Sequence, residues 1–209
     1  MSDLRDIREE YESPPLHRPD LHADPVHQFD AWFQQALEIN ELANAAALAT
    51  ATADARPSAR MMLLKGFDAD GFVFFTDYES RKGAEIAANP QAALLFYWQP
   101  LYRQVRIGGR LKKCSVKESE DYFVSRPLGS RLAASISHQS RVVSDRSALE
   151  SAMQQAHSEG PDVERPERWG GYLLVPEEYE FWQGRPSRLH DRFRYLKRQE
   201  GWRLERLMP

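Results

Sequence analysis

The chain has 209 residues, of which 42% are hydrophobic and 28% are charged, and its formal net charge is −3. This length suffices for one large domain or two small ones, and the near-neutral charge argues against a histone-like nucleic-acid binder. The single cysteine, Cys114, excludes an intrachain disulfide and zinc sites of the CxxC type.

The start of the chain predicts an arm followed by a helix. Residues 1–23 are polar and aperiodic and contain three prolines, so we interpret them as a mobile arm with a short helix around Leu4–Tyr11. Asp24 is an N-cap followed by Pro25, and apolar residues then recur at helical spacing. This pattern predicts a helix from 25 to about 41.

The remaining chain has patterns of both strands and helices. Asp68-Ala69-Asp70-Gly71 is a hairpin signal, Gly108-Gly109 indicates a bulge or a close backbone approach, and Ser115 has capping-box spacing to Glu118. The predicted strands are 58–65, 72–77, 91–99, 102–115, 170–175, 179–183, 192–198 and 202–207, and the predicted helices are 80–88, 115–125, 128–136 and 144–157. The pattern assigns no element type to 46–53.

This spacing of strands is typical of an antiparallel barrel, so we expect a mainly β (α+β) protein with inserted and flanking helices. The strand–helix alternation of a Rossmann fold is missing, and so are GxGxxG and a Walker A loop. A nucleotide would therefore be bound by side chains on a barrel surface.

The charge is unevenly distributed along the chain. Residues 1–30 hold 3 basic and 8 acidic residues, whereas 101–146 hold 10 basic and 4 acidic ones and 181–209 hold 8 basic and 3 acidic ones. Solvated charged faces explain such blocks. Arginines grouped near serine, glutamine and aromatic residues also fit an anion site for phosphate.

Two cationic segments lie in the first half of the chain. In the strand Arg60–Lys65 two cations bracket four apolar residues, as in an edge strand with solvated ends or a strand that lies against a flat ring between anions. Ser80-Arg81-Lys82 opens a predicted helix, whose free N–H groups attract phosphate. An ordinary capped surface helix has the same pattern.

A further polar group follows the predicted helix 115–125. Tyr122 and Arg126 are four residues apart, which a helix places on one face, and Ser130 follows the turn forced by Pro127. A phenol, a guanidinium and a hydroxyl together can bind phosphate, although a helix end with a capping serine explains them equally well. Gln139-Ser140-Arg141 adds polar donors in a loop.

The most specific segment lies near the C-terminus. Phe181-Trp182-Gln183-Gly184 is followed by Arg188-Leu189-His190-Asp191-Arg192, whose alternate residues project to one face if the segment is extended. Two guanidiniums around an imidazole repel one another unless an anion or an electron-rich ring lies there. No GxSxG elbow is present, which excludes a hydrolase triad of that type. The six histidines show no HxH or HExxH spacing, so we expect no metal site.

In this order, the segments quoted above together with Arg103-Gln104-Val105 and Ser125-Arg126-Pro127 resemble the pyridoxine (pyridoxamine) 5′-phosphate oxidase family. The resemblance covers essentially the whole chain, and the ordered set is far more specific than any single motif. It implies one FMN-binding split β-barrel domain of antiparallel Greek-key type over 24–209. It also implies a homodimer with FMN at the subunit interface. From the near-neutral charge and the lack of a long apolar run we expect no nucleic-acid and no membrane partner.

The resemblance implies roles for individual residues. FMN contacts fall on Arg60, Met61, Met62, Leu63, Leu64, Lys65, Phe75, Thr76, Arg81, Lys82, Gln104, Gln139, Ser140, Trp182 and Arg192. Substrate contacts fall on Arg8, Tyr11, Lys65, Tyr122, Arg126, Ser130, Arg188 and His190, of which Arg188 and His190 are the expected catalytic residues. Phe75 stands where some relatives carry Tyr. Glu9 interrupts the Arg-Arg-Glu-Tyr arm that can close over the substrate, which puts its role as a lid in doubt.

The implied activity is that of a pyridoxal 5′-phosphate synthase in vitamin B6 cofactor biosynthesis or salvage. Pyridoxine or pyridoxamine 5′-phosphate would lose a hydride from C4′ to flavin N5, and O2 would reoxidise the flavin and give H2O2. FMN and the substrate each bring a phosphate, so the resemblance implies two anion sites. Another split-barrel flavoprotein, such as a flavin reductase or a flavin- or haem-binding stress protein, is the alternative, but it has no need of a second phosphate site.

Two absences bear on the location of the protein. No apolar run approaches the roughly 20 residues of a membrane helix. Residues 1–12 are charged and lack the apolar core of a secretory signal. We therefore expect a soluble, cytoplasmic protein.

Overall fold

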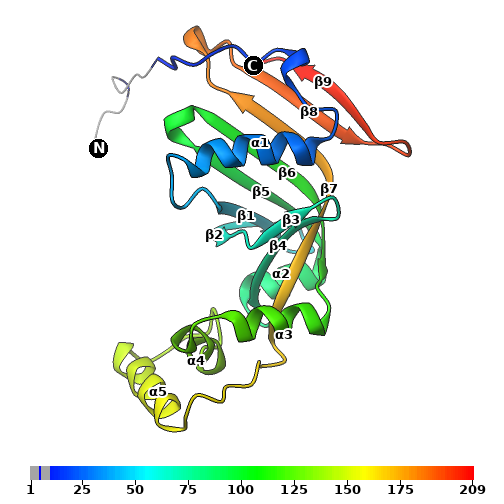
Figure 1. Ribbon diagram of the computed structural model, residues 1–209. Helices are drawn as coiled ribbons and strands as arrows, with labels where there is room; N and C mark the ends of the chain where they lie inside the picture. Colours follow the sequence, from blue (N-terminus) through cyan, green and yellow to red (C-terminus); the bar gives the residue numbers. More distant parts are fainter. Residues whose placement is uncertain (1–4, 6–9) are drawn as a thin grey trace.

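The structure is a computed structural model that describes residue 5 and residues 10–209. Its strands form one curled antiparallel sheet, which confirms the expected mainly β fold (Figure 1). The helices are α1 Pro25–Leu37, α2 Arg81–Ala88, α3 Val116–Ser125, α4 Leu128–Ile136 and α5 Arg146–Ser158, with 3-10 turns at Arg18–Asp20, Gln99–Leu101 and Pro186–Arg188. The strands are β1 Ala45–Ala51, β2 Pro57–Leu63, β3 Gly66–Asp68, β4 Gly71–Asp77, β5 Gln91–Trp98, β6 Arg103–Lys113, β7 Trp169–Gln183, β8 Asp191–Lys197 and β9 Trp202–Leu207.

The order of the strands explains the curl of the sheet. The hydrogen-bonded path runs β2-β1-β5-β6-β7-β4-β3, and β8 pairs with β7 and β9. Its two ends, β2 and β3, are consecutive in the chain, so the sheet must bend round to bring them together. The strands β2 and β4 are not paired with each other: β2 pairs with β1, and β4 pairs with β3 and β7. Residues of both β2 and β4 line an opening.

Helix α1 supplies aromatic side chains to the core. The Asp24 side chain caps it by accepting from the Val26 N–H, as predicted. Phe29 is fully buried, and its ring centroid lies 4.9 Å from that of Phe72 and 5.1 Å from that of Phe96. Burial of such a side chain contributes about 1.5–3 kcal/mol. The helix ends at Leu37, earlier than the predicted 41, because the chain turns there.

The longest strand corrects one prediction. The segments 170–175 and 179–183 are predicted as separate strands. They form the single strand β7, which passes Pro176 at a bulge: Gly108 pairs with Glu178 and Gly109 pairs with Pro176. The predicted bulge at Gly108-Gly109 is thereby confirmed, and a Cβ on Gly109 would lie 2.1 Å from the Val175 carbonyl oxygen.

Local signals located the later helices well. The four helices predicted after residue 80 are confirmed to within about two residues at their ends. Ser115 Oγ accepts from the Glu118 N–H while the Glu118 carboxylate accepts from the Ser115 N–H, which is the predicted capping box. Two short or alanine-rich strands, β1 and β3, were not predicted.

The described part of the N-terminal arm packs against the C-terminal strands. Leu16 is buried, and its N–H donates to Asp191 Oδ2 at 3.0 Å. Arg206 donates to the Leu16 carbonyl at 3.0 Å. Most of the predicted helix around Leu4–Tyr11 lies outside the described residues. Within the described part of the chain, no helix is long and apolar enough to cross a membrane.

Candidate functional site

Two adjoining cavities lie in the opening between β2 and β4. The first, here called the α2 cavity, measures about 460 Å³ and is lined by Ser58, Ala59, Arg60, Met61, Met62, Phe75, Thr76, Arg81, Lys82, Gln139 and Ser140. The second, the α3 cavity, measures about 440 Å³ and is lined by Met61, Met62, Leu63, Lys65, Phe75, Tyr122, Arg126, Pro127, Ser130, Gln139 and Trp169. The two cavities share the side chains of Met61, Met62, Phe75 and Gln139.

A third cavity of about 620 Å³ opens elsewhere, between β1, β5 and β6. Its lining includes several small residues and none of the residues predicted to bind a ligand. The predicted flavin and substrate residues that line a cavity therefore lie in the smaller, more cationic pair.

The α2 cavity has the chemistry of an anion site. Lys82 Nζ donates to Thr76 Oγ1 at 3.0 Å and to Gln139 Oε1 at 2.9 Å, and the Arg81 backbone N–H donates to Ser140 Oγ at 3.2 Å. Burial and the neighbouring Arg60 lower the pKa of Lys82. Because α2 begins here, its helix dipole adds positive potential. An anion such as phosphate would relieve the repulsion between these cations.

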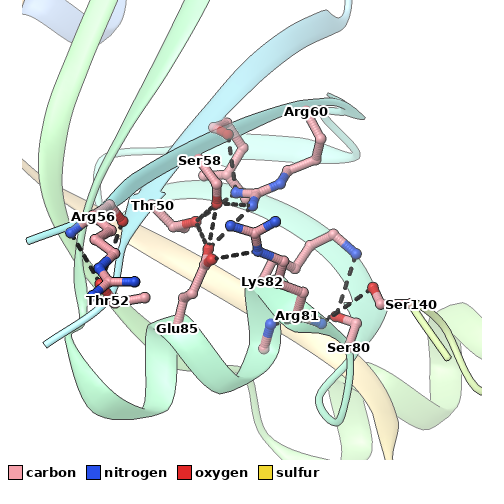
Figure 2. A network of polar contacts seen from close by, with 12 residues as sticks. Thr50, Thr52, Arg56, Ser58, Arg60, Ser80, Arg81, Lys82, Glu85 and Ser140 are labelled. Atoms are coloured by element: carbon pink, nitrogen blue, oxygen red, sulfur yellow. Dashed lines mark hydrogen bonds and ion pairs between the residues drawn. The ribbon is translucent and has the colours of Figure 1, made fainter.

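A carboxylate that was not predicted holds two of these cations (Figure 2). Glu85 Oε1 accepts from Arg81 Nε at 3.0 Å, and Glu85 Oε2 accepts from Arg60 Nη2 at 3.1 Å. Ser58 Oγ and Thr50 Oγ1 also donate to Oε2. Burial alone would raise the pKa of Glu85, but these four hydrogen-bonding groups lower it to about 2. The only sequence signal for this role is the four-residue spacing from Arg81.

The α3 cavity joins aromatic rings to a partly buried arginine. The Tyr122 ring stacks on Phe75 with centroids 4.0 Å apart, and the Arg126 guanidinium lies 4.6 Å from the centroid of the Trp169 ring. Arg126 Nη1 is buried and has no hydrogen-bond partner among the described residues, which is rare for a buried donor and calls for an explanation. Burial lowers the pKa of Arg126. Arg126 follows the last residue of α3 in extended conformation, so the predicted shared helix face with Tyr122 is not formed.

Several of the other predicted residues form a C-terminal cluster around His190. The His190 ring centroid lies 4.6 Å from that of Trp182 and 5.5 Å from that of Tyr11. His190 Nδ1 accepts from the Arg185 N–H at 3.1 Å. Burial and the charges of Arg188 and Arg192 lower the pKa of His190.

The segment that carries this cluster is not fully extended. The projection of its alternate residues to one face, which was predicted for an extended segment, therefore does not apply to all of it. Pro186–Arg188 forms a 3-10 turn, with φ of 56° at Ser187 and 59° at Arg188. Cross-strand pairing then places Gln104 beside Trp182, and Trp182 beside Arg192, in one row across β6, β7 and β8. Arg192 also pairs with Glu180, N to O 2.7 Å.

The C-terminal cluster and the α3 cavity draw on residues at opposite ends of β7. Trp169 lines the α3 cavity at the start of the strand, and Trp182 belongs to the cluster near its end. At about 3.3 Å per residue, the strand between them is roughly 40 Å long. A single chain therefore does not bring all the predicted site residues together.

The remaining predicted residues are placed as follows. Leu64 is buried and lines neither cavity; its N–H donates to the Asn44 carbonyl at 2.8 Å. Arg8 lies outside the described residues. Trp169 was not predicted to belong to the site. No group of three or more histidine, cysteine, aspartate or glutamate side chains that could hold a metal occurs in the described part of the chain.

Comparison with known proteins identifies the family of the chain. Residues 33–159 match the family model of pyridoxamine 5′-phosphate oxidase, and residues 169–209 match the pyridoxine 5′-phosphate oxidase C-terminal dimerisation region. A pyridoxine/pyridoxamine 5′-phosphate oxidase of Burkholderia cenocepacia is 54% identical, with 100% of both chains covered. One of Bordetella petrii is 53% identical over 99% of both chains.

Solved structures share the fold. PhzG from Burkholderia lata, in complex with tetrahydrophenazine-1-carboxylic acid, has a TM-score of 0.88 at 32% identity, covering 94% of this chain and 99% of that one. An FMN-binding protein of Nostoc punctiforme, related to pyridoxamine 5′-phosphate oxidase, has a TM-score of 0.73 at 21% identity, covering 88% and 98%. The fold is the split β-barrel, and the chain belongs to the pyridoxine/pyridoxamine 5′-phosphate oxidase family.

Proposed function

We propose that this protein is an FMN-dependent oxidase that converts pyridoxine 5′-phosphate and pyridoxamine 5′-phosphate to pyridoxal 5′-phosphate. The observation that carries the proposal is the pair of adjoining cavities, each lined by its own set of cationic and polar side chains of the kind that can bind phosphate. FMN is the cofactor, and its phosphate fits the α2 cavity, where Arg60, Arg81 and Lys82 gather.

The α3 cavity is the proposed substrate site. Lys65, Tyr122, Arg126 and Ser130 would hold the phosphate of the substrate, and the buried Nη1 of Arg126 supplies an unused donor there. A charge-assisted hydrogen bond of this kind contributes about 1.5–3 kcal/mol. The apolar side chains shared by the cavities would lie beneath the flat rings of flavin and pyridine.

The residues of this chain would bind and orient the substrate. When bound, FMN supplies the hydride acceptor for C4′, its N5 atom, and O2 returns it to the oxidised form with release of H2O2. Arg188 and His190 would cover the pyridine ring on the side away from the flavin. Because His190 Nδ1 accepts from a backbone N–H, its neutral ring presents Nε2–H as a donor to the substrate.

The proposed site needs two chains. The cluster of Trp182, Arg188 and His190 cannot reach the cavities of its own chain, so a second copy would supply it. On the outer sheet face, Met61 is 65% exposed and Tyr97 is 49% exposed, and pairing places Tyr97 in the row of Gln104 and Trp182. A homodimer that buries this face would be stabilised by the apolar contact. The match of residues 169–209 to a dimerisation region supports this interpretation.

Absorption spectroscopy of the purified protein tests the proposal. We expect a flavin spectrum that bleaches when pyridoxine 5′-phosphate is added without O2 and returns when O2 is admitted. Unphosphorylated pyridoxine is the control, and it should bleach the flavin far more slowly because the α3 cavity cations lose their partner. Bleaching by tetrahydrophenazine-1-carboxylic acid, the ligand in the PhzG complex, but not by the phosphorylated vitamin would contradict the proposed substrate. A protein that stays colourless with added FMN would contradict the proposal.

A further inference from the structure

Glu85 lies behind the α2 cavity. It projects from α2, is only 5% exposed, and is absent from the lining of the cavity, so it does not meet a ligand there directly. Both of its oxygens are nevertheless bonded to residues that do line the cavity, Arg60 and Arg81. A buried carboxylate costs free energy unless its partners are well placed, and here the partners are cations of the proposed cofactor site.

The hydrogen bonds drawn around Glu85 in Figure 2 lead from the arginines, directly or through two hydroxyls, to the Glu85 carboxylate, which accepts. Arg60 Nη2 donates to Ser58 Oγ and Arg60 Nη1 donates to Thr50 Oγ1. The two hydroxyls then donate to Glu85 Oε2. A hydroxyl has only one proton to donate. When that proton points at the carboxylate, the lone pairs of the hydroxyl oxygen face Arg60 and accept from it. The charge of Glu85 therefore orients the whole network.

The same network leaves defined donors for a ligand. Both Nη groups of Arg60 are bonded within the protein, to Leu48, Thr50, Ser58 and Glu85, which fixes its charge at the cavity wall. Arg81 is held through Nε alone, and within the described part of the chain its two Nη groups donate to no protein atom. An arginine held in this way presents a planar pair of donors that matches phosphate.

We propose that Glu85 is the positioning residue of the flavin-phosphate site, which holds Arg60 and Arg81 in their binding arrangement before the cofactor arrives. This inference rests on the proposed placement of the FMN phosphate in the α2 cavity. Without the carboxylate, Arg60, Arg81 and Lys82 would repel one another and Arg81, whose side chain is 68% exposed, would move freely. Binding would then have to order it, at a cost in affinity.

Glu85→Gln is a sharp substitution because it keeps the shape and changes one oxygen to an amide. The single remaining oxygen can face either Arg81 Nε or the group formed by Ser58, Thr50 and Arg60, but not both. The NH2 group then confronts a guanidinium donor, so one arginine loses its anchor. If the negative charge mattered only as a repulsive neighbour of phosphate, the same substitution would tighten FMN binding.

The experiment compares FMN with riboflavin, which lacks the phosphate. Apoprotein is titrated with each flavin by quenching of flavin fluorescence, and the ratio of the two Kd values measures the preference for phosphate. We expect wild type to prefer FMN strongly. Glu85→Gln should reduce this preference about tenfold, a change of 1.4 kcal/mol, through weaker FMN binding, with the riboflavin Kd within about twofold of wild type.

Two further variants complete the test. Thr50→Val removes one hydroxyl between Arg60 and Glu85 but keeps the charge, and it should reduce the preference about threefold. Glu150→Gln is the matched control, because Glu150 pairs with Arg146 one turn away on the exposed helix α5, and it should change nothing. If Glu85→Gln binds neither flavin, Thr50→Val decides the question.

The outcomes separate this inference from the proposed function. A normal or increased preference for FMN in Glu85→Gln and Thr50→Val, with wild type still selective, would overturn the role of Glu85 alone. Parallel loss of both flavins in Thr50→Val would also overturn it, since that indicates a general structural defect. Wild type that binds the two flavins equally would contradict the placement of the phosphate, and this inference with it.

Discussion

The imidazole of His190 illustrates how single contacts set protonation. The Arg185 N–H donates to Nδ1 at 3.1 Å, so the neutral ring carries its proton on Nε2. Burial comes first among the causes that lower its pKa below the ordinary 6.5, followed by the charges of Arg188 and Arg192. A lowered pKa means that the neutral form persists below pH 6.5, and at pH 7 Nε2 is a hydrogen-bond donor.

Replacing Arg188 should change the pKa of His190. Arg188→Gln removes one of the two repelling charges, so the pKa of His190 rises, although burial keeps it from reaching a fully ordinary value. Nitrogen NMR shifts of the ring, followed over pH in both proteins, measure the two midpoints. Arg198→Gln, an exposed arginine at the end of the β8–β9 hairpin, is the control and should leave the midpoint in place. An identical midpoint in Arg188→Gln and wild type would show that this charge does not act on the ring.

Glu85 should also make stability depend on pH. Its pKa is about 2 in the folded protein against 4.5 as the ordinary value, so its ionised form stabilises the fold. A depressed carboxyl pKa gives stability that is fully present above about pH 4.5 and lost as the pH falls towards 2. We expect Glu85→Gln to be less stable than wild type by about 3–4 kcal/mol at pH 7, with a smaller difference at pH 3. Urea unfolding at several pH values measures this, and a difference independent of pH would contradict it.

The residues of the site were predictable to different degrees. Arg81, Lys82 and Arg126 stand in local patterns that can be read from the sequence, and all three line cavities. Glu85 and Trp169 were missed. The partners of Glu85 come from β1 and β2 as well as α2, and the register of those strands is set by long-range pairing that a local pattern does not contain.

At the scale of elements, those defined by contacts between residues near in sequence were predicted more accurately than those defined by contacts between distant residues. Helix α3 begins at a capping box and ends before Pro127, which are contacts between residues near in sequence. Strand β1 is rich in alanine and has no alternation of polar and apolar residues, so it is defined by its neighbours β2 and β5. Strand β7 passes Pro176 only because a bulge absorbs the missing donor.

Helix α2 gives an element-scale prediction. A Cβ on Gly83 would lie 2.0 Å from the Tyr78 carbonyl oxygen, whereas one on Gly129 in α4 would meet nothing within 4 Å. Gly83→Ala should therefore cost about 1–3 kcal/mol of stability and weaken FMN binding, since α2 must shift and carries Arg81 and Lys82 with it. Gly129→Ala, the matched control, should be neutral or stabilising by about 0.5–1 kcal/mol. Thermal unfolding and FMN titration compare them, and equal effects would contradict the close approach.

At the scale of the molecule, the two parts of the proposed site are separated by the length of β7. The sequence places the motifs in order along the chain, but order does not say which of them meet. The resemblance implied a homodimer, and the fold supplies a physical reason: a 15-residue strand is too stiff and too long to bring its own ends together. The cavities of one chain would therefore be completed by the C-terminal cluster of its partner.

Mixed dimers test this arrangement directly. Arg126→Ala damages the α3 cavity and Arg188→Ala damages the C-terminal cluster, so each homodimer should lose most of its activity. If each site combines parts of two chains, a mixed dimer has one site with both defects and one with none. Random mixing makes half of the dimers mixed, so refolding or coexpressing the two variants together should restore about a quarter of wild-type activity.

The control mixture combines the Arg126→Ala and Lys65→Ala variants, because Arg126 and Lys65 both line the α3 cavity. Every site in that mixed dimer keeps one damaged cavity, so no activity should return. If instead each chain completed its own site, the Arg126 and Arg188 variants would also fail to complement, because every chain would carry one defect. Recovery in the first mixture and none in the second therefore requires sites shared between chains, which a change in folding or expression does not imitate.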